Sequence, residues 1–143
     1  MTVIAWDGRA LAADKRSVDN GTVRTVTKIH RHGRELIGAA GTTSSCTSTV
    51  RWYMDGAIAA DYPACQKDKD DWCALVVITA EGKVHYYDKC PVPTVFEDSF
   101  AAWGSGRAEA LASMYCGKTA REAVEVASIF DASCGNGVDE LIL

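Results

Sequence analysis

The stretch Thr2-Val3-Ile4-Ala5-Trp6, directly behind Met1, is a short apolar run opened by a hydroxyl residue. Methionine followed by a small residue is commonly removed after translation, which would leave Thr2 with a free α-amino group. Such a residue carries a nucleophile and a base together, because an amine with a pKa of about 7.7–8.0 can take the hydroxyl proton directly or through one water. In an arbitrary protein the same stretch would simply begin a strand, so its interpretation depends on the rest of the chain.

Hairpins follow this first run. Asp7-Gly8-Arg9 separates it from a second apolar run over 10–14, and Asp-Gly is a strong hairpin signal. Asn20-Gly21 predicts another turn, and β-branched residues then favour a strand from Thr22 to about His30. After a further turn the chain returns as a strand over 35–41. The first part of the chain is therefore predicted to form successive hairpins with no helix between them.

The pattern becomes helical at Thr42, where several N-cap candidates precede apolar residues at helical spacing. We expect this helix to end near Asp61, ahead of Pro63. A polar loop over 66–71 then leads to a third hairpin, with arms over 74–79 and 84–87. The first arm is continuously apolar, which predicts a strand buried on both faces.

The C-terminal part reads as two helices and a strand. A helix is expected from about Arg107 to Tyr115, and the capping box over 119–122 opens a second helix that ends near Asp131. Residues 138–143 form the last predicted strand. Strands grouped in hairpins with helices set apart from them indicate an α+β layered fold, with two sheets face to face and helices outside. A chain of 143 residues that is 48% hydrophobic fits one domain over 1–143.

Composition excludes several classes of function. A net charge of −4 disfavours indiscriminate nucleic-acid binding. No run approaches the roughly 18–20 apolar residues that span a bilayer, and no secretory signal precedes the first strand, so a cytoplasmic protein without membrane contact is expected. Neither metal nor cofactor is expected, because the histidines are scattered and no phosphate-binding glycine loop occurs. Free thiols are expected for the six cysteines, which form no CxxC pair: Cys46, Cys65, Cys73, Cys90, Cys116 and Cys134.

Six pieces of the chain, taken in order, resemble the proteasome β-subunit family, which includes the bacterial HslV-type protease. They are Thr2-Val3-Ile4-Ala5, Leu11-Ala12-Ala13-Asp14-Lys15-Arg16, Thr27-Lys28-Ile29, Gly38-Ala39-Ala40-Gly41, Gly104-Ser105-Gly106 and Asp131-Ala132-Ser133-Cys134-Gly135. The resemblance covers nearly the whole chain. It implies the four-layer αββα sandwich of N-terminal nucleophile hydrolases, which agrees with the layered fold that the strand and helix pattern predicts.

The resemblance also implies catalytic roles. Thr2 would be the nucleophile that forms an ester intermediate, and Lys28 would lie beside it. A cation there lowers the pKa values of the hydroxyl and the amine, which favours the free amine as base. Asp14 would pair with Lys28 and hold it in place.

The remaining implied roles concern the oxyanion, the amine and the substrate. Gly41 would present its backbone N–H to the oxyanion. Ser105 and Asp131 would bond the α-amino group and relay its proton. The residue before the scissile bond would lie in an uncharged pocket lined by Ser17, Val26 and Ala39.

Some positions depart from the family's pattern. Thr42 stands where many members have a second glycine, and Cys134 stands where they usually carry a serine. Ser133 could replace that serine only if the turn shifts by one residue. The segment 59–73 is shorter than the long helix that the family usually places there. Retention of Met1 would block the α-amine.

The leading hypothesis is a threonine endopeptidase that hydrolyses unfolded polypeptide inside a homo-oligomeric ring, with an unfoldase ATPase as a candidate partner. A non-catalytic, proteasome-like structural subunit is one alternative. The joint presence of Thr2, Asp14, Lys28 and Gly41 argues against it, because a scaffold does not need the set. An N-terminal nucleophile amidohydrolase that cleaves a small amide is the other alternative, and peptide and small-amide substrates would distinguish the two enzymes.

Overall fold

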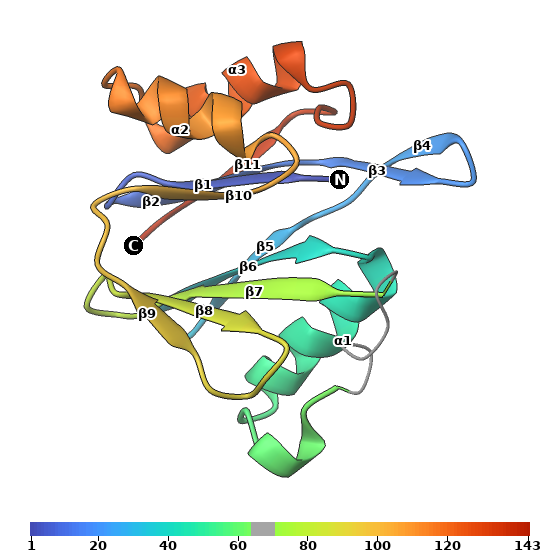
Figure 1. Ribbon diagram of the computed structural model, residues 1–143, viewed down its shortest axis with the longest axis vertical. Coiled ribbons are helices and arrows are strands. Elements are labelled where there is room, and N and C mark those ends of the chain that lie inside the picture. Colours follow the sequence, from blue (N-terminus) through green and yellow to red (C-terminus); the bar gives the residue numbers. More distant parts are fainter. Residues whose placement is uncertain (64–70) are drawn as a thin grey trace.

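The protein is an αββα sandwich, described by a computed structural model over residues 1–63 and 71–143 (Figure 1). Helices α2 and α3 cover the outer face of one sheet, and α1 covers the outer face of the other. The four-layer arrangement expected from the sequence is confirmed. The elements are β1 (Val3–Trp6), β2 (Ala10–Asp14), β3 (Arg16–Asp19), β4 (Thr22–Thr25), β5 (Ile29–His32), β6 (Glu35–Gly41), α1 (Thr43–Met54), η1 (Ala59–Asp61), β7 (Cys73–Ile78), β8 (Val84–Asp88), β9 (Thr94–Phe96), β10 (Ala101–Gly104), α2 (Arg107–Tyr115), α3 (Ala120–Phe130) and β11 (Val138–Ile142).

The first sheet has the antiparallel order β10-β1-β2-β11. Side chains alternate across β1, because successive residues of a strand point to opposite faces. Ile4 and Trp6 pack between the two sheets, whereas Val3 and Ala5 pack beneath α2 and α3. Every residue of β1 is therefore buried, which explains a run of apolar residues without polar alternation.

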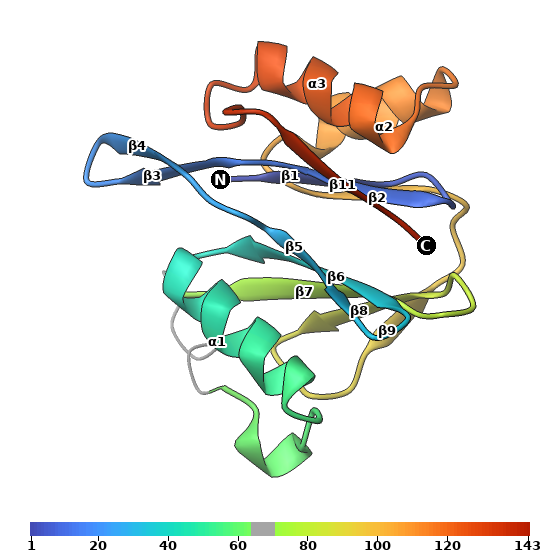
Figure 2. The ribbon, with the colours of Figure 1, turned by 180° about the vertical axis from the view of Figure 1, so that it is seen from behind.

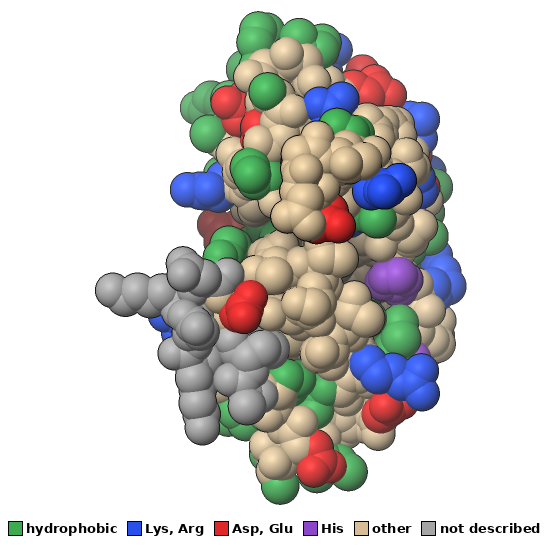
Figure 3. Space-filling view, turned by 90° about the vertical axis from the view of Figure 1, so that its right-hand side faces the viewer, with side chains coloured by type: hydrophobic (Ala, Val, Ile, Leu, Met, Phe, Trp, Pro, Cys, Tyr) green, Lys and Arg blue, Asp and Glu red, His purple; other side chains and the backbone are tan. Residues whose placement is uncertain are grey.

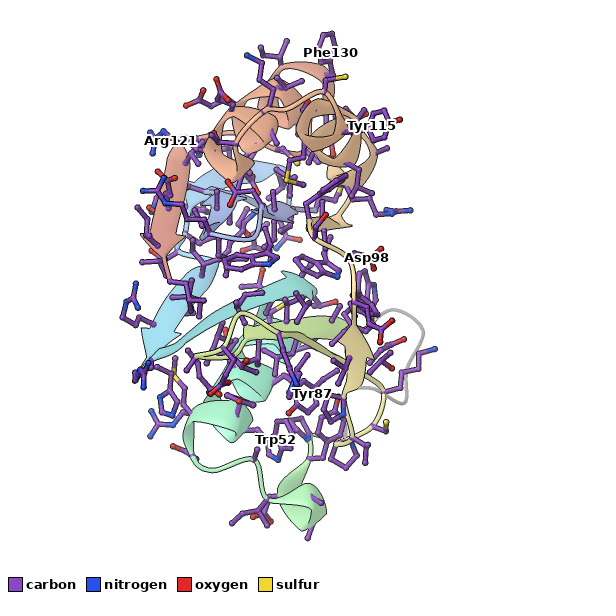
Figure 4. All side chains as sticks on the ribbon, turned by 90° about the vertical axis from the view of Figure 1, so that its left-hand side faces the viewer. Trp52, Tyr87, Asp98, Tyr115, Arg121 and Phe130 are labelled. Atoms are coloured by element: carbon purple, nitrogen blue, oxygen red, sulfur yellow. The ribbon has the colours of Figure 1, made fainter. Side chains whose placement is uncertain are left out.

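The second sheet has the antiparallel order β5-β6-β7-β8-β9. All six residues of β7 are buried, as its continuous apolar run predicts. Leu75 and Val77 face α1, where the Trp52 and Tyr87 rings meet edge to face with centroids 5.7 Å apart (Figure 4). The two sheets thus pack face to face, and helices cover the outer face of each.

The strand predicted over 22–30 is interrupted, which corrects the sequence-based boundary. β4 ends at Thr25 and pairs with β3 in a separate exposed hairpin, and β5 begins at Ile29 and pairs with β6. Residues 26–28 cross from the hairpin to the second sheet (Figure 2). A run of β-branched residues indicates extended backbone but does not show that its two halves have different partners.

Helix α1 ends at Met54 and not near Asp61. Gly56 has φ +111° and Ala57 has φ +53°, so the backbone leaves the helical conformation directly after Asp55. Positive φ costs glycine little, which makes Gly56 a natural position for this exit. The separate turn η1 follows at Ala59. The polar loop expected over 66–71 lies outside the described residues, apart from its last position.

The remaining helices begin and end close to their predicted boundaries. The predicted capping box of α3 is present, because the Thr119 hydroxyl accepts from Glu122 N at 3.2 Å and the Glu122 carboxylate accepts from Thr119 N at 2.9 Å. Asp7, in the turn between β1 and β2, accepts a further bond from Ala120 N at 2.8 Å. In the parts of the chain that the structure describes, no helix combines the length and apolar character needed to cross a membrane.

Candidate active site

The start of β1 lies at the edge of the first sheet where β2 and β10 end. β1 runs antiparallel to both β2 and β10, so its first residues lie beside the last residues of those strands. Val3 is opposite Gly104, and Asp14 follows directly on the β2 residue that pairs with Ile4. This register brings residues from three separate motifs to Thr2.

Thr2 is nearly buried, with 5% of its surface exposed. Its backbone nitrogen donates to Ser105 Oγ at 3.2 Å, and its hydroxyl donates to the Met1 carbonyl oxygen at 2.7 Å. Lys28 Nζ donates to that same carbonyl oxygen at 3.2 Å. The hydroxyl of Thr2 and the ammonium of Lys28 therefore converge on one carbonyl.

Asp14 holds Lys28 in this position. Its Oδ1 accepts from Lys28 Nζ at 2.8 Å and from Val3 N at 3.0 Å. Its Oδ2 accepts from the backbone nitrogens of Arg16 at 3.1 Å and Gly135 at 3.0 Å. The Asp14 side chain is fully buried and that of Lys28 is 8% exposed. Four donors fix the carboxylate, which in turn limits the positions of the ammonium.

Ser105 follows β10, and its hydroxyl lies between the Thr2 amide and the side chains after α3. Cys134 Sγ lies 3.7 Å from Ser105 Oγ and donates to Asp131 Oδ2 at 3.3 Å. Asp131 Oδ1 accepts from Ser133 N at 2.8 Å. The Thr2 nitrogen therefore contacts Ser105 directly, and Asp131 lies one step behind it.

Cys134, and not Ser133, occupies the position between Ser105 and Asp131. The Ser133 hydroxyl instead lies 2.8 Å from Met1 Sδ. The shift of one residue that would let Ser133 take the family's serine position is therefore absent from this turn.

Two pKa values reflect this arrangement. Desolvation acts to raise the pKa of Asp131, but hydrogen bonds from Ser105, Ser133 and Cys134 outweigh it and hold that pKa below its usual value. Burial, followed by the charge of Asp14, raises the pKa of the Cys134 thiol to about 12. Cys134 is therefore a neutral donor and Asp131 an ionised acceptor at neutral pH.

Gly41 ends β6 in a conformation and a position that exclude other residues. Its φ is +145°, and a Cβ atom there would lie 2.1 Å from the Trp72 carbonyl oxygen and 2.9 Å from Cys73 Cα. The next residue, Thr42, donates its N–H to the same Trp72 oxygen at 2.9 Å. Close contact with the backbone before β7 thus sets the position of Gly41.

A cavity of about 1120 Å³ lies in front of Thr2, Lys28 and Gly41. Ser17, Val26 and Ala39, the three pocket residues inferred from the family resemblance, all line it. The end of the molecule with the β3–β4 hairpin and the start of α1 shows mainly backbone and uncharged polar side chains in its middle (Figure 3). Residues from five of the six motifs, and all three inferred pocket residues, therefore border one open space.

One face of α1 also lines the cavity, which the sequence analysis did not recognise. These residues are Thr43, Ser44, Cys46, Thr47, Val50, Arg51 and Met54. Their spacing is that of a single helical face, and this periodicity could have identified the wall. It could not have shown which layer the face contacts.

Arg16 is a further residue that sequence reasoning missed. Its guanidinium donates to the Ala132 carbonyl at 2.7 Å and to Asn136 Oδ1 at 3.2 Å. It also packs against Gly135, where an added Cβ would lie 2.9 Å from Arg16 Nη2. The Arg16 guanidinium therefore anchors the turn that follows Asp131, and the Arg16 backbone N–H donates to Asp14. No local sequence signal pairs these positions.

Metal binding has no candidate residues in the described ranges, 1–63 and 71–143. No group of three or more His, Cys, Asp or Glu side chains there could hold a metal ion.

Comparison with known proteins finds similarity in solved structures. No protein-family model matches the chain, and no curated protein matches it by sequence. BPH of Thiobacillus denitrificans in complex with epoxomicin superposes with a TM-score of 0.75 at 18% identity, covering 100% of this chain and 98% of that one. HslV from Trypanosoma brucei gives 0.71 at 20% identity, covering 99% and 98%. A second structure of Thiobacillus denitrificans BPH gives 0.68 at 19% identity, covering 99% and 96%.

These identities are low, so the likeness is one of fold. It extends over nearly the full length of both chains. The resemblance drawn from six short motifs is thereby confirmed at the level of three-dimensional structure. The chain has the αββα fold of the N-terminal nucleophile hydrolases and is similar throughout its length to HslV-type, proteasome-like proteins.

Proposed function

We propose that this chain is a threonine-type endopeptidase in which Thr2 becomes the N-terminal nucleophile after Met1 is removed. One observation carries the proposal: the Thr2 hydroxyl and the buried Lys28 ammonium converge on the Met1 carbonyl oxygen, at 2.7 and 3.2 Å. Removal of Met1 vacates that position and leaves a free amine beside Ser105. The nucleophile, the base and a cation would then share one site.

In the proposed reaction the free α-amine takes the hydroxyl proton of Thr2 while Oγ1 attacks the carbonyl carbon of a substrate peptide bond. The Gly41 N–H stabilises the resulting oxyanion. The carbon–nitrogen bond then breaks, and the leaving amine takes the proton from the α-ammonium of Thr2. Water hydrolyses the remaining ester with the same amine as base, which releases the acid and restores the threonine.

The surrounding side chains are proposed to hold this machinery in its working state. Lys28, fixed by Asp14, lowers the pKa values of the hydroxyl and the amine, so more of the amine is unprotonated at neutral pH. Ser105, in contact with Cys134 and hydrogen-bonded to Asp131, orients the amine toward the hydroxyl. Asp14, Ser105 and Asp131 act through these contacts and do not touch the reacting carbonyl.

The cavity supports a peptide as the substrate more than a small amide. At about 1120 Å³ it exceeds the roughly 300–1000 Å³ of a usual small-molecule site. Ser17, Val26 and Ala39 contribute no charge to it, so we propose a preference for Leu, Phe or Tyr before the scissile bond. Fluorogenic peptides that differ only at this residue test the preference, and fastest cleavage after Asp or Lys would contradict it. Faster turnover of small amides than of peptides would instead favour the amidohydrolase alternative.

The cellular setting of the proposed enzyme rests on the likeness in fold. We propose a homo-oligomeric ring in the cytoplasm, which takes up unfolded polypeptide and accepts an unfoldase ATPase as a partner. Because a BPH structure of the same fold is in complex with epoxomicin, we also expect epoxomicin to block this chain when Thr2 is N-terminal.

The deciding experiment compares intact mass and peptide hydrolysis before and after treatment with methionine aminopeptidase. Protein that retains Met1 should be folded and inert, because a peptide nitrogen is not basic and the Met1 carbonyl occupies the site. Trimmed protein should gain activity. Trimmed Thr2→Ser should keep part of it, whereas trimmed Thr2→Ala should have none. If fully Met1-retaining protein hydrolyses peptides as fast as trimmed protein, the N-terminal threonine mechanism is wrong, and an inert trimmed protein would favour the structural-subunit alternative.

A further inference from the structure

The cavity in front of the start of β1 is lined by more positive than negative charge. The described residues that line it include four side chains that are cationic at neutral pH and one acidic side chain, which are Arg16, Arg24, Lys28 and Arg51, and Asp19. The chain as a whole has a net charge of −4. A basic cavity in an acidic protein favours the entry of ligands that carry negative charge.

The four cations differ in what already binds them. Lys28 and Arg51 each form a salt bridge with an aspartate. The guanidinium of Arg16 is held by uncharged oxygen atoms of the loop after α3. Within the part of the chain that the structure describes, the exposed guanidinium of Arg24 forms no ion pair or hydrogen bond. The charge of Arg24 is therefore available to a ligand in the cavity.

The register of the β3–β4 hairpin places Arg24 beside the proposed pocket for the residue before the scissile bond. Ser17, which lines that pocket, is directly opposite Arg24. Directly opposite residues of an antiparallel pair have their side chains on the same face. The Ser17 hydroxyl lies 3.4 Å from Thr43 Oγ1 at the start of α1, so this face of the hairpin is turned toward the cavity.

The backbone of Arg24 is fixed although its side chain is exposed. Its carbonyl oxygen accepts from Asn136 Nδ2 at 3.2 Å, and the same amide donates to Thr25 Oγ1 at 3.1 Å. At the base of the hairpin, Val26 N donates to the Lys15 carbonyl oxygen at 2.8 Å. The loop after α3 thus sets the position of this strand relative to the candidate active site.

The hairpin leads away from Thr2 and turns back at Asn20 and Gly21 (Figure 2). An extended peptide brings every second side chain to the same side, about 6.5–7 Å apart. When the residue before the scissile bond occupies the proposed pocket, the third residue before that bond therefore points to the same side. The side chain of Arg24, which starts beside the pocket on the outer strand of the hairpin, has a length comparable to this interval.

We propose that Arg24 is a specificity-determining residue, which binds an aspartate or glutamate at the third residue before the scissile bond. The planar fork of a guanidinium matches the two oxygen atoms of a carboxylate. Asp19, the acidic side chain of the lining, lies on the same face of the hairpin nearer its tip and opposes the preference by repelling that carboxylate. The effect on turnover rests on the proposed peptidase function, whereas the binding of an acidic peptide does not.

The test uses protein trimmed of Met1 and two fluorogenic peptides that differ only in Glu or Gln at the third residue before the scissile bond. Both have Leu directly before that bond. The Glu peptide should have a kcat/KM about three- to fivefold higher, the scale of an exposed ion pair, and the ratio should shrink at high NaCl concentration. Arg24→Gln should bring the ratio close to one, and Asp19→Asn should raise it.

Arg34→Gln is the matched control, because it removes the same charge from an exposed arginine that does not line the cavity. Its ratio should equal that of the wild type. A wild-type ratio of one, or a ratio that Arg24→Gln leaves unchanged, would overturn the proposal.

A binding measurement separates this proposal from the peptidase function. Fluorescence anisotropy with labelled peptides and trimmed Thr2→Ala protein should show tighter binding of the Glu peptide than of the Gln peptide. Adding Arg24→Gln to the same protein should remove the difference. Preferential binding that depends on Arg24, in a protein whose trimmed wild type does not hydrolyse peptides, would support the Arg24 site and count against the peptidase.

Discussion

Lys28 is a buried, charged residue that the fold should not need for its stability. Its ammonium is held by Asp14 at 2.8 Å, but Asp14 also accepts three backbone hydrogen bonds, from Val3, Arg16 and Gly135. If the ammonium is removed, those three donors still satisfy the carboxylate. The usual penalty for leaving a buried charge unpaired is therefore reduced at this site.

Lys28→Ala should accordingly abolish most turnover and preserve the fold. We expect kcat/KM for a fluorogenic peptide to fall by about 10²–10⁴-fold in trimmed protein, the usual loss for a positioned catalytic group. Lys28→Arg should not rescue the activity, because a guanidinium is larger and spreads its charge over a planar fork. Thermal unfolding measured beside the kinetics separates lost chemistry from lost structure.

Lys15→Ala is the control, because Lys15 forms a more exposed ion pair with Asp139 at 2.6 Å and does not line the cavity. Its kcat/KM should stay within a few-fold of wild type. Near-wild-type turnover in Lys28→Ala would exclude the proposed role of Lys28.

Cys134 predicts a pH dependence of stability. Its pKa is raised from 9.0 to about 12 in the folded protein, first by burial and then by the charge of Asp14. Between these values the unfolded chain loses the thiol proton and the folded protein keeps it, so stability falls as pH rises. The slope from this one group is at most about 1.4 kcal/mol per pH unit.

Urea unfolding of wild type and Cys134→Ser over this alkaline range measures the effect. The serine hydroxyl does not titrate there, so the variant should lose less stability per pH unit than wild type. Cys116→Ser, which changes an exposed thiol, should follow wild type. Parallel curves for wild type and Cys134→Ser would contradict the raised pKa.

At the scale of the elements, the contact between the end of β6 and the start of β7 positions Gly41. Gly41→Ala combines a φ of +145° with a Cβ atom 2.1 Å from the Trp72 carbonyl oxygen. Backbone strain of this kind alone costs on the order of 1–3 kcal/mol, and the clash adds to it. We expect a lower free energy of unfolding in urea, together with loss of peptide hydrolysis.

Gly56→Ala measures the cost of backbone strain without the steric clash expected in Gly41→Ala. Gly56, just beyond α1, has φ +111°, but an added Cβ there would lie within 4 Å of no described atom apart from those of its chain neighbours. The free energy of unfolding of this variant should fall only by the cost of strain, and its activity should be kept. Equal destabilisation of the two variants would show that the approach of β7 to Gly41 is not the constraint.

At the scale of the whole molecule, the outer helices expose large apolar side chains. Tyr115 at the end of α2 is 83% exposed, and Ile129 and Phe130 at the end of α3 are 75% and 73% exposed (Figure 4). Exposed apolar groups in one layer are typical of surfaces that another protein covers. We expect this layer to form a contact between copies of the chain in the proposed ring.

Sedimentation velocity tests this expectation. The wild type should sediment as an assembly at micromolar concentration, and Phe130→Ser should shift the distribution toward smaller species because it removes apolar contact area. Val92→Ser, which changes a residue 71% exposed beyond β8, should leave the distribution unchanged. A monomeric wild type would refute the ring.

The sequence by itself determined the elements whose signals are local. The apolar run of β7, the capping box of α3 and the Asp-Gly turn before β2 each correspond to a feature of the structure, because alternation, capping and turn chemistry depend on residues close together in the chain. The six motifs led to the fold through their resemblance to the proteasome β-subunit family. The same resemblance implied Thr2, Asp14, Lys28 and Ser105 as site residues, and the structure brings these four residues together.

Only the tertiary structure decided which distant groups meet. The break between β4 and β5 depends on two different partner strands, and the end of α1 at Met54 depends on the turn at Gly56. The position of Cys134 and the contact of Arg16 with Gly135 leave no trace in local periodicity. The physical reason is that a pattern along the chain reports how much of each residue is buried, whereas the partner in a contact is set by the packing of layers that are remote in sequence.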